Sequence, residues 1–139
     1  MEILCPYCGN IIQQENICSV CHSNIEWVNK IYNKSNLYYI KGYYCAKNRE
    51  LSKAVMYLKR ATFFNKFNTQ ARNLLGLVYF QRGDIGEALK QWIISISLDK
   101  NDNRAKQYLA KMQNTMNHFE EYKDAIMLYN RALRYVKQK

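Results

Sequence analysis

Residues 75–88 read LGLVYFQRGDIGEA, and this stretch has the signals of two helices joined by a tight turn. Gly83 is placed to end the first helix, because glycine adopts the left-handed conformation that closes a helix at little cost. Asp84 is placed to cap the second helix, with Glu87 three residues later reaching back in a capping box. The stretch therefore predicts a pair of helices.

The same features recur along the chain with a period of 34 residues. Ser35 is taken as position 1 of the repeating unit. Positions 6, 8, 20 and 24 are then filled in successive units by Ile40 and Leu74, Gly42 and Gly76, Ala54 and Ala88, and Leu58 and Trp92. A fixed period of this length is typical of helical repeat proteins.

This pattern resembles the tetratricopeptide repeat (TPR), in which small residues at positions 8 and 20 let two helices approach and a bulky residue at 24 fills the space between them. The resemblance implies a mainly α fold, a TPR-like α-solenoid of about three helix pairs in 35–68, 69–102 and 103–139. The first unit is weaker, since Cys45 stands where the second has Tyr79. The third needs a three-residue insertion before positions 20, 24 and 27 are met by Ala125, Tyr129 and Ala132.

The resemblance also implies a concave groove lined by the first helix of each repeat. The groove positions are Asn36, Tyr39, Tyr43 and Ala46, then Gln70, Asn73, Leu77 and Phe80, then Arg104, Gln107, Lys111 and Asn114. Amides can hydrogen-bond a peptide backbone, and Arg104 with Lys111 could bind a carboxylate. We expect an extended or helical peptide of acidic character there, with plain solvated helix surface as the alternative for any single residue.

Four cysteines near the N-terminus form two Cys-x-x-Cys pairs, Cys5 with Cys8 and Cys18 with Cys21. Two such pairs can supply four thiolates to one tetrahedral Zn²⁺. The arrangement resembles a short zinc ribbon of the β-hairpin type over residues 1–29, although His22 stands where glycine is usual. About 23 residues cannot fold by burial alone, so we expect one structural zinc per chain to fold this segment.

Other interpretations of these cysteines remain open. The first pair, with its intervening residues, matches the glutaredoxin tetrapeptide, but only four residues precede it. The second pair followed by His22 matches a c-type haem attachment pattern, and iron could replace zinc in a four-sulfur site. The fifth cysteine, Cys45, falls on an apolar helix face, and we expect a small buried side chain there.

Composition narrows the class of protein. The chain has 139 residues, with 48% hydrophobic residues, five glycines and one proline, which disfavours an all-β barrel or sandwich. No apolar run is long enough to span a bilayer and no signal peptide is visible, so we expect a cytoplasmic protein. The net charge is +10, yet residues 1–29 hold three acids and no Lys or Arg, which places a domain boundary near residue 30.

The end of the chain carries one further expectation. A helix over 119–136 would expose too many apolar side chains for one face: Ile126, Leu128, Tyr129, Leu133, Tyr135 and Val136. Solenoid ends usually carry a polar cap, so this helix predicts either self-association or a protein that continues past residue 139.

The residue inventory lacks the groups of an active site. No nucleophile–base pair, glycine-rich phosphate loop or carboxylate dyad is evident, and the histidines are His22 and His118. We therefore expect a non-enzymatic scaffold or adaptor that binds a protein segment. The alternative is a nucleic-acid-binding protein, because residues 30–66 hold nine basic residues against Glu50; those placed to touch phosphates are Lys41, Lys47, Arg49, Lys53, Lys59 and Arg60.

Overall fold

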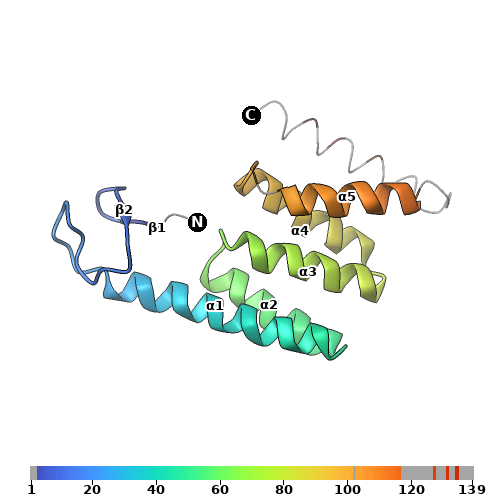
Figure 1. Cartoon of the computed structure of the whole chain (residues 1–139), viewed down its shortest axis with the longest axis horizontal. Coiled ribbons are helices and arrows are strands. Elements are labelled where there is room, and N and C mark those ends of the chain that lie inside the picture. The colour runs from blue at the N-terminus through green and yellow to red at the C-terminus, as the bar shows by residue number, and fades with distance from the viewer. Residues whose placement is uncertain (1–2, 102, 117–126, 128–130, 132–133, 135–139) are drawn as a thin grey trace.

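The computed structural model describes residues 3–101, 103–116, 127, 131 and 134. In this part the chain is mainly helical, with a small two-stranded hairpin at its N-terminal end (Figure 1). The elements are β1 (Ile3–Leu4), β2 (Ile11–Ile12), α1 (Glu26–Lys47), α2 (Leu51–Phe64), α3 (Thr69–Arg82), α4 (Ile85–Leu98) and α5 (Asn103–Met116). No helix in these residues is long and apolar enough to cross a membrane.

Several sequence predictions fall outside the described residues. These are the second helix of the third unit with Ala125, Tyr129 and Ala132, the histidine His118, and the apolar residues Ile126, Leu128, Leu133, Tyr135 and Val136. The expectation of self-association through the last helix stays a prediction.

The 34-residue period of the sequence is also a period of the structure. Helices α2 and α4 begin at residues 51 and 85, and α3 and α5 at residues 69 and 103, each pair 34 apart. The backbone repeats as well, because Glu50 and Asp84, before α2 and α4, both have φ −81° and ψ 67°. Asn65 and Asp99, after the same helices, both have extended backbones.

The turn between α3 and α4 confirms one sequence prediction and corrects another. Gly83 ends α3 with φ 85°, and its equivalent Arg49 also has a positive φ of 62°. The capping box was wrong, because Asp84 precedes α4 but its side chain makes no capping hydrogen bond. Its Oδ2 lies 3.4 Å from Arg82 Nε instead, so the guanidinium at the end of α3 attracts the carboxylate away from the α4 backbone.

The two glycines at position 8 let the helices of each pair approach closely, as predicted. A Cβ placed on Gly42 would lie 2.6 Å from Cγ of Leu58. A Cβ on Gly76 would overlap the indole ring of Trp92, whose Nε1 donates a hydrogen bond to the backbone oxygen of Asn73 at 3.1 Å. Only glycine therefore allows Leu58 and Trp92 to fill the space between the paired helices.

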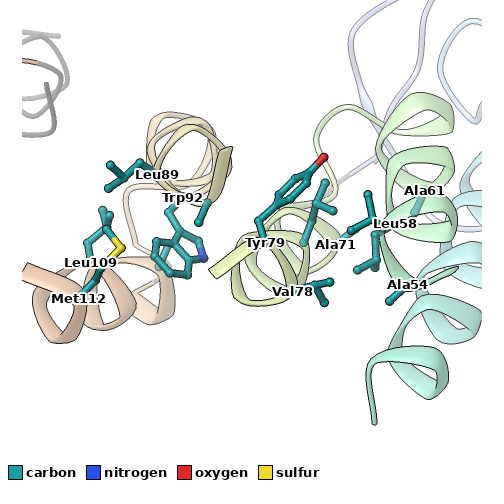
Figure 2. Packing of buried hydrophobic residues seen from close by; sticks show 14 of the residues in the cluster. Ala54, Leu58, Ala61, Ala71, Val78, Tyr79, Leu89, Trp92, Leu109 and Met112 are labelled. Atoms are coloured by element: carbon teal, nitrogen blue, oxygen red, sulfur yellow. The ribbon is translucent and has the colours of Figure 1, made fainter. Parts of the chain in front are cut away.

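One hydrophobic core runs through the described helices. Each helix packs on the next, and α1 also contacts α3, as α3 contacts α5. Figure 2 shows the core continuing from Ala54 and Leu58 on α2 to Leu109 and Met112 on α5. Cys45 is half-buried against this core. The odd-numbered helices therefore lie side by side in one layer.

A buried polar contact joins the first three helices. The Ser35 hydroxyl on α1 donates to the Ala61 backbone oxygen on α2 at 2.7 Å. Asn68 Nδ2 donates to the same hydroxyl at 3.1 Å, while Asn68 Oδ1 accepts a hydrogen bond from the Ala71 N–H and caps α3. Both side chains are nearly inaccessible to solvent.

The residues before α1, 3–25, are called the hairpin from here on, and they share a small core with the start of α1. The core consists of Cys5, Ile12, Cys18, Ile25 and Val28, with Tyr32 packed beside them. Val28 and Tyr32 lie on the first two turns of α1, so that helix carries the hairpin at its N-terminal end (Figure 1). The charge change near residue 30 consequently falls inside one continuous helix.

Candidate metal centre

The first cysteine pair lies on a tight turn between β1 and β2. The strands pair antiparallel, and the Cys5 N–H donates to the Asn10 backbone oxygen at 2.7 Å. The Gly9 N–H donates back to the Cys5 oxygen at 2.9 Å, and Gly9 has φ 75°. Glycine is favoured there because a side chain is strained at this φ.

The second cysteine pair repeats this geometry with different residues. The Cys18 N–H donates to the Ser23 oxygen at 3.0 Å, and the His22 N–H donates to the Cys18 oxygen at 2.9 Å. His22 has φ 57°, so it occupies the left-handed position that Gly9 holds in the first turn. The two turns therefore have the same backbone shape, and His22 stands where the first turn has glycine. A histidine side chain adds strain at this φ.

The four sulfur atoms of the two turns converge on one point. The Sγ atoms of Cys5, Cys8, Cys18 and Cys21 all lie within 4.8 Å of one another. Cys5 Sγ is 3.7 Å from Cys21 Sγ, and Cys8 Sγ is 3.6 Å from Cys18 Sγ. Metal–sulfur bonds of about 2.3 Å in a tetrahedron give sulfur–sulfur edges of about 3.8 Å, so the donor set fits one tetrahedral ion.

Hydrogen bonds prepare the second pair for metal binding. The Ser23 hydroxyl, 3.3 Å from Cys21 Sγ, and the Ser23 N–H together lower the pKa of Cys21 to about 6. The backbone N–H groups of Cys21 and Val20 lower the pKa of Cys18. Both effects favour the thiolate, which is the form that binds a metal.

The pKa of Cys8 moves in the opposite direction. Its backbone hydrogen bond with Asn10 favours the thiolate, but desolvation and the sulfur atoms of Cys18, Cys5 and Cys21 outweigh that effect and raise the pKa to about 12. Four sulfur atoms at this spacing cannot all carry negative charge without a cation between them, so a bound metal ion is what allows the complete thiolate set.

The structure therefore brings together the four cysteines that the sequence paired. His22 and Cys45 are not members of this group within the described residues. Four protein sulfurs would fill the tetrahedral shell of one ion and leave no position on it for a water molecule.

The residues predicted to line a groove lie on α1, α3 and α5. Most are accessible, with Tyr43, Gln70, Arg104, Gln107 and Lys111 exposed and Tyr39 and Leu77 half-buried. Asn73 differs because it is only 5% exposed, in the close contact between α3 and α4. It has little surface to offer a ligand.

Sequence reasoning missed a cleft between the hairpin and the helices. It has a volume of about 980 Å³. Five short stretches of chain line it: β1, the residues just after β2, α1, the α2–α3 turn and the end of α4. These stretches are far apart in the sequence, so no local motif indicates the cleft. The abundance of asparagine between residues 16 and 68 is the one sequence feature that its lining shares.

No family model matches the chain, and no curated protein matches it.

Proposed function

We propose that this chain is a non-enzymatic adaptor, a TPR-like α-solenoid that binds a peptide segment on the concave surface of α1, α3 and α5. The observation that carries the proposal is the pattern of helix contacts. Helix α3 contacts both α1 and α5 as well as its sequence neighbours. Helices α2 and α4 contact each other less than these odd-numbered helices do. In a stack of helix pairs, the more closely spaced layer forms the inner, concave surface.

We also propose that the hairpin binds one structural Zn²⁺ through Cys5, Cys8, Cys18 and Cys21. A Cys₄ set in two tight turns is the usual donor set of structural zinc, although iron also accepts four thiolates. Elemental analysis of protein purified without added metal distinguishes these ions. We expect one zinc per chain and a colourless protein; an iron–thiolate absorption band would contradict zinc, and titratable native thiols without metal would favour a redox module.

The charge of the groove suggests the chemistry of the peptide. Arg104 and Lys111 are both exposed on α5 and lie seven residues apart, which is about two helical turns and places them on one face. Two cations at this spacing favour a peptide with acidic side chains.

A charge reversal tests this surface. A partner is first isolated by affinity purification from the native cell and its binding segment is mapped. We expect the double variant Arg104→Glu with Lys111→Glu to lose binding to that segment, whereas Lys90→Glu, exposed on α4 outside the inner layer, leaves it unchanged. Equal binding by the double variant would overturn the assignment of this groove.

One observation favours a second candidate, a single-stranded nucleic-acid-binding protein. On α1 and α2, the Tyr38 ring stacks on Tyr57 at 6.2 Å and on Phe64 at 5.7 Å between ring centroids. Three cations lie over these rings, namely Lys34, Lys41 and Arg60. Aromatic platforms beside cations are typical of sequence-tolerant binding to single strands.

A labelled oligonucleotide of deoxythymidine tests the second candidate. If it binds, the affinity falls steeply with salt, because each phosphate contact releases counterions. Binding that is lost in the variant Lys41→Glu with Arg60→Glu would favour this candidate over the adaptor. No detectable binding in low salt would remove it.

A further inference from the structure

The cleft between the hairpin and the helices has walls of unusual chemistry. Of its fifteen lining residues, eight are Asn or Gln, one is the acid Asp99, and none is Lys or Arg. In a chain of net charge +10, this wall is nearly uncharged. A phosphate backbone gains nothing from such a surface, since its binding depends on basic side chains.

The carboxamides of the cleft are not all equally available to a ligand. Asn29, Asn65 and Asn68 are used by the fold: Asn29 Nδ2 donates to the Glu15 oxygen at 2.7 Å, and the other two hold the α2–α3 turn. Asn36 and Gln70 are exposed, and no hydrogen-bond partner is found for their side chains within the part of the chain that the structure describes. They are available to a ligand that both donates and accepts hydrogen bonds.

The opposite wall is the edge of a strand. Ile3 and Leu4 both line the cleft, whereas the two residues of β2 do not. Successive residues of a strand point to opposite faces of a sheet, so a cleft that reaches both residues of β1 runs along its edge. In the described residues β1 pairs only with β2, and the Cys5 N–H also bonds toward β2, so by alternation the backbone groups on the other edge are those of Leu4.

We propose that this cleft binds an extended, uncharged peptide segment as a third strand beside β1, with Asn36 and Gln70 hydrogen-bonded to its backbone. A peptide bond carries one donor and one acceptor, which matches both a carboxamide and an open strand edge. The volume of about 980 Å³ accommodates several residues of extended chain. This inference rests on the proposed peptide-binding function and assigns it a second, metal-supported contact.

The cleft and the groove together set the composition of the peptide. Asn36 and Gln70, on α1 and α3, are groove positions that also line the cleft, and the cations of α5 lie two helices away from α1. Packed helices are about 8–10 Å apart, so α1 and α5 are separated by about 18 Å, or about five extended residues. The peptide therefore has an uncharged stretch followed or preceded, about five residues away, by acidic side chains.

The test uses the whole metal-loaded chain and a phage-displayed library of random 12-residue peptides. A selected peptide is synthesised with a fluorescent label, and its affinity is measured by anisotropy. We expect Asn36→Asp with Gln70→Glu to weaken binding at least tenfold, because carboxylates keep the shape but lose the donors. Gln81→Glu is the matched control for Gln70→Glu, since it makes the same change at an exposed site on α3 outside the cleft.

Two further measurements address the strand edge. N-methylation of single peptide bonds should weaken binding at one residue of the peptide and not at its neighbours, because Leu4 offers one backbone acceptor to an added strand. Removal of the metal with a chelator should weaken binding at least tenfold, because Leu4 directly precedes the ligand Cys5.

Each remaining outcome overturns something specific. If a selected peptide keeps its affinity for the Asn36/Gln70 variant but loses it for the Arg104/Lys111 variant, the cleft is wrong and the groove remains. If no peptide is selected, the proposed function fails together with the cleft. If an adenine oligonucleotide displaces the selected peptide from the cleft, the occupant is a nucleic acid and the strand assignment is overturned.

Discussion

His22 shows how one residue can strain an otherwise regular turn. Its φ of 57° places it in the left-handed region that Gly9 occupies at the equivalent point of the first turn. A non-glycine residue in this region costs about 1 kcal/mol or more. If the hairpin binds the proposed metal, its folding is coupled to that binding, and this cost lowers the affinity for the metal.

We predict that His22→Gly tightens metal binding about fivefold, which corresponds to about 1 kcal/mol. Gly9→Ala should change the affinity in the opposite direction, since nothing lies within 4 Å of its added Cβ and only the backbone is strained. Competition with a chromophoric chelator measures both variants. Weaker binding by His22→Gly would show that the imidazole supports the site.

At the scale of elements, the contact between α3 and α4 depends on the absence of a side chain at Gly76. A methyl group there would overlap the buried Trp92 indole, and overpacking of this kind costs about 1–3 kcal/mol. We predict that Gly76→Ala lowers the free energy of unfolding by about 2 kcal/mol, as measured by urea denaturation.

Two variants control this prediction. Gly86→Ala, in the first turn of α4 with no atom within 4 Å of the added Cβ, should stabilise the protein slightly because alanine is the better helix former. In a Trp92→Leu background, the cost of Gly76→Ala should largely disappear. An undiminished cost there would mean that the alanine disturbs something other than the indole.

The polar contact among α1, α2 and α3 is a second device that joins elements. Asn68→Ala removes both the α3 cap and the partner of the Ser35 hydroxyl, and we predict a loss of about 2 kcal/mol in unfolding free energy. Ser35→Ala should cost about 1 kcal/mol.

Because the two side chains share one hydrogen bond, the double variant should lose less than the sum of the single losses. Thr62→Ala is the control, since that hydroxyl bonds only within its own helix and its removal should cost little. Additive losses in the double variant would show that Ser35 and Asn68 act independently.

At the scale of the whole molecule, the sequence predicted features that depend on spacing and missed those that depend on orientation. The cysteine spacing predicted four sulfurs at one point, and the resemblance to the tetratricopeptide repeat implied the contact of Gly76 with Trp92. The cap of Asp84 was wrong because Arg82, brought near by the turn, competes for the carboxylate. The cleft depends on how the hairpin folds back beside α1, and no local pattern encodes that angle.

The hairpin and the helices have separate cores, and this separation predicts how the molecule responds to loss of metal. The hairpin core ends at Tyr32, whereas the helical core begins on α1 with Tyr38 and Tyr39. The hairpin cannot replace the proposed metal with buried apolar surface, because two of the five buried side chains in its core are the proposed ligands Cys5 and Cys18.

We predict that a chelator unfolds the hairpin and the first turns of α1 but leaves α2–α5 folded. Far-ultraviolet circular dichroism should fall slightly, and the main thermal unfolding transition should remain. The variant Cys8→Ser with Cys21→Ser should give the same result without chelator, which separates metal loss from any effect of the reagent. Complete loss of the helical signal would mean instead that the two cores unfold as one cooperative unit, with α1 transmitting the stability of the metal site to the helices.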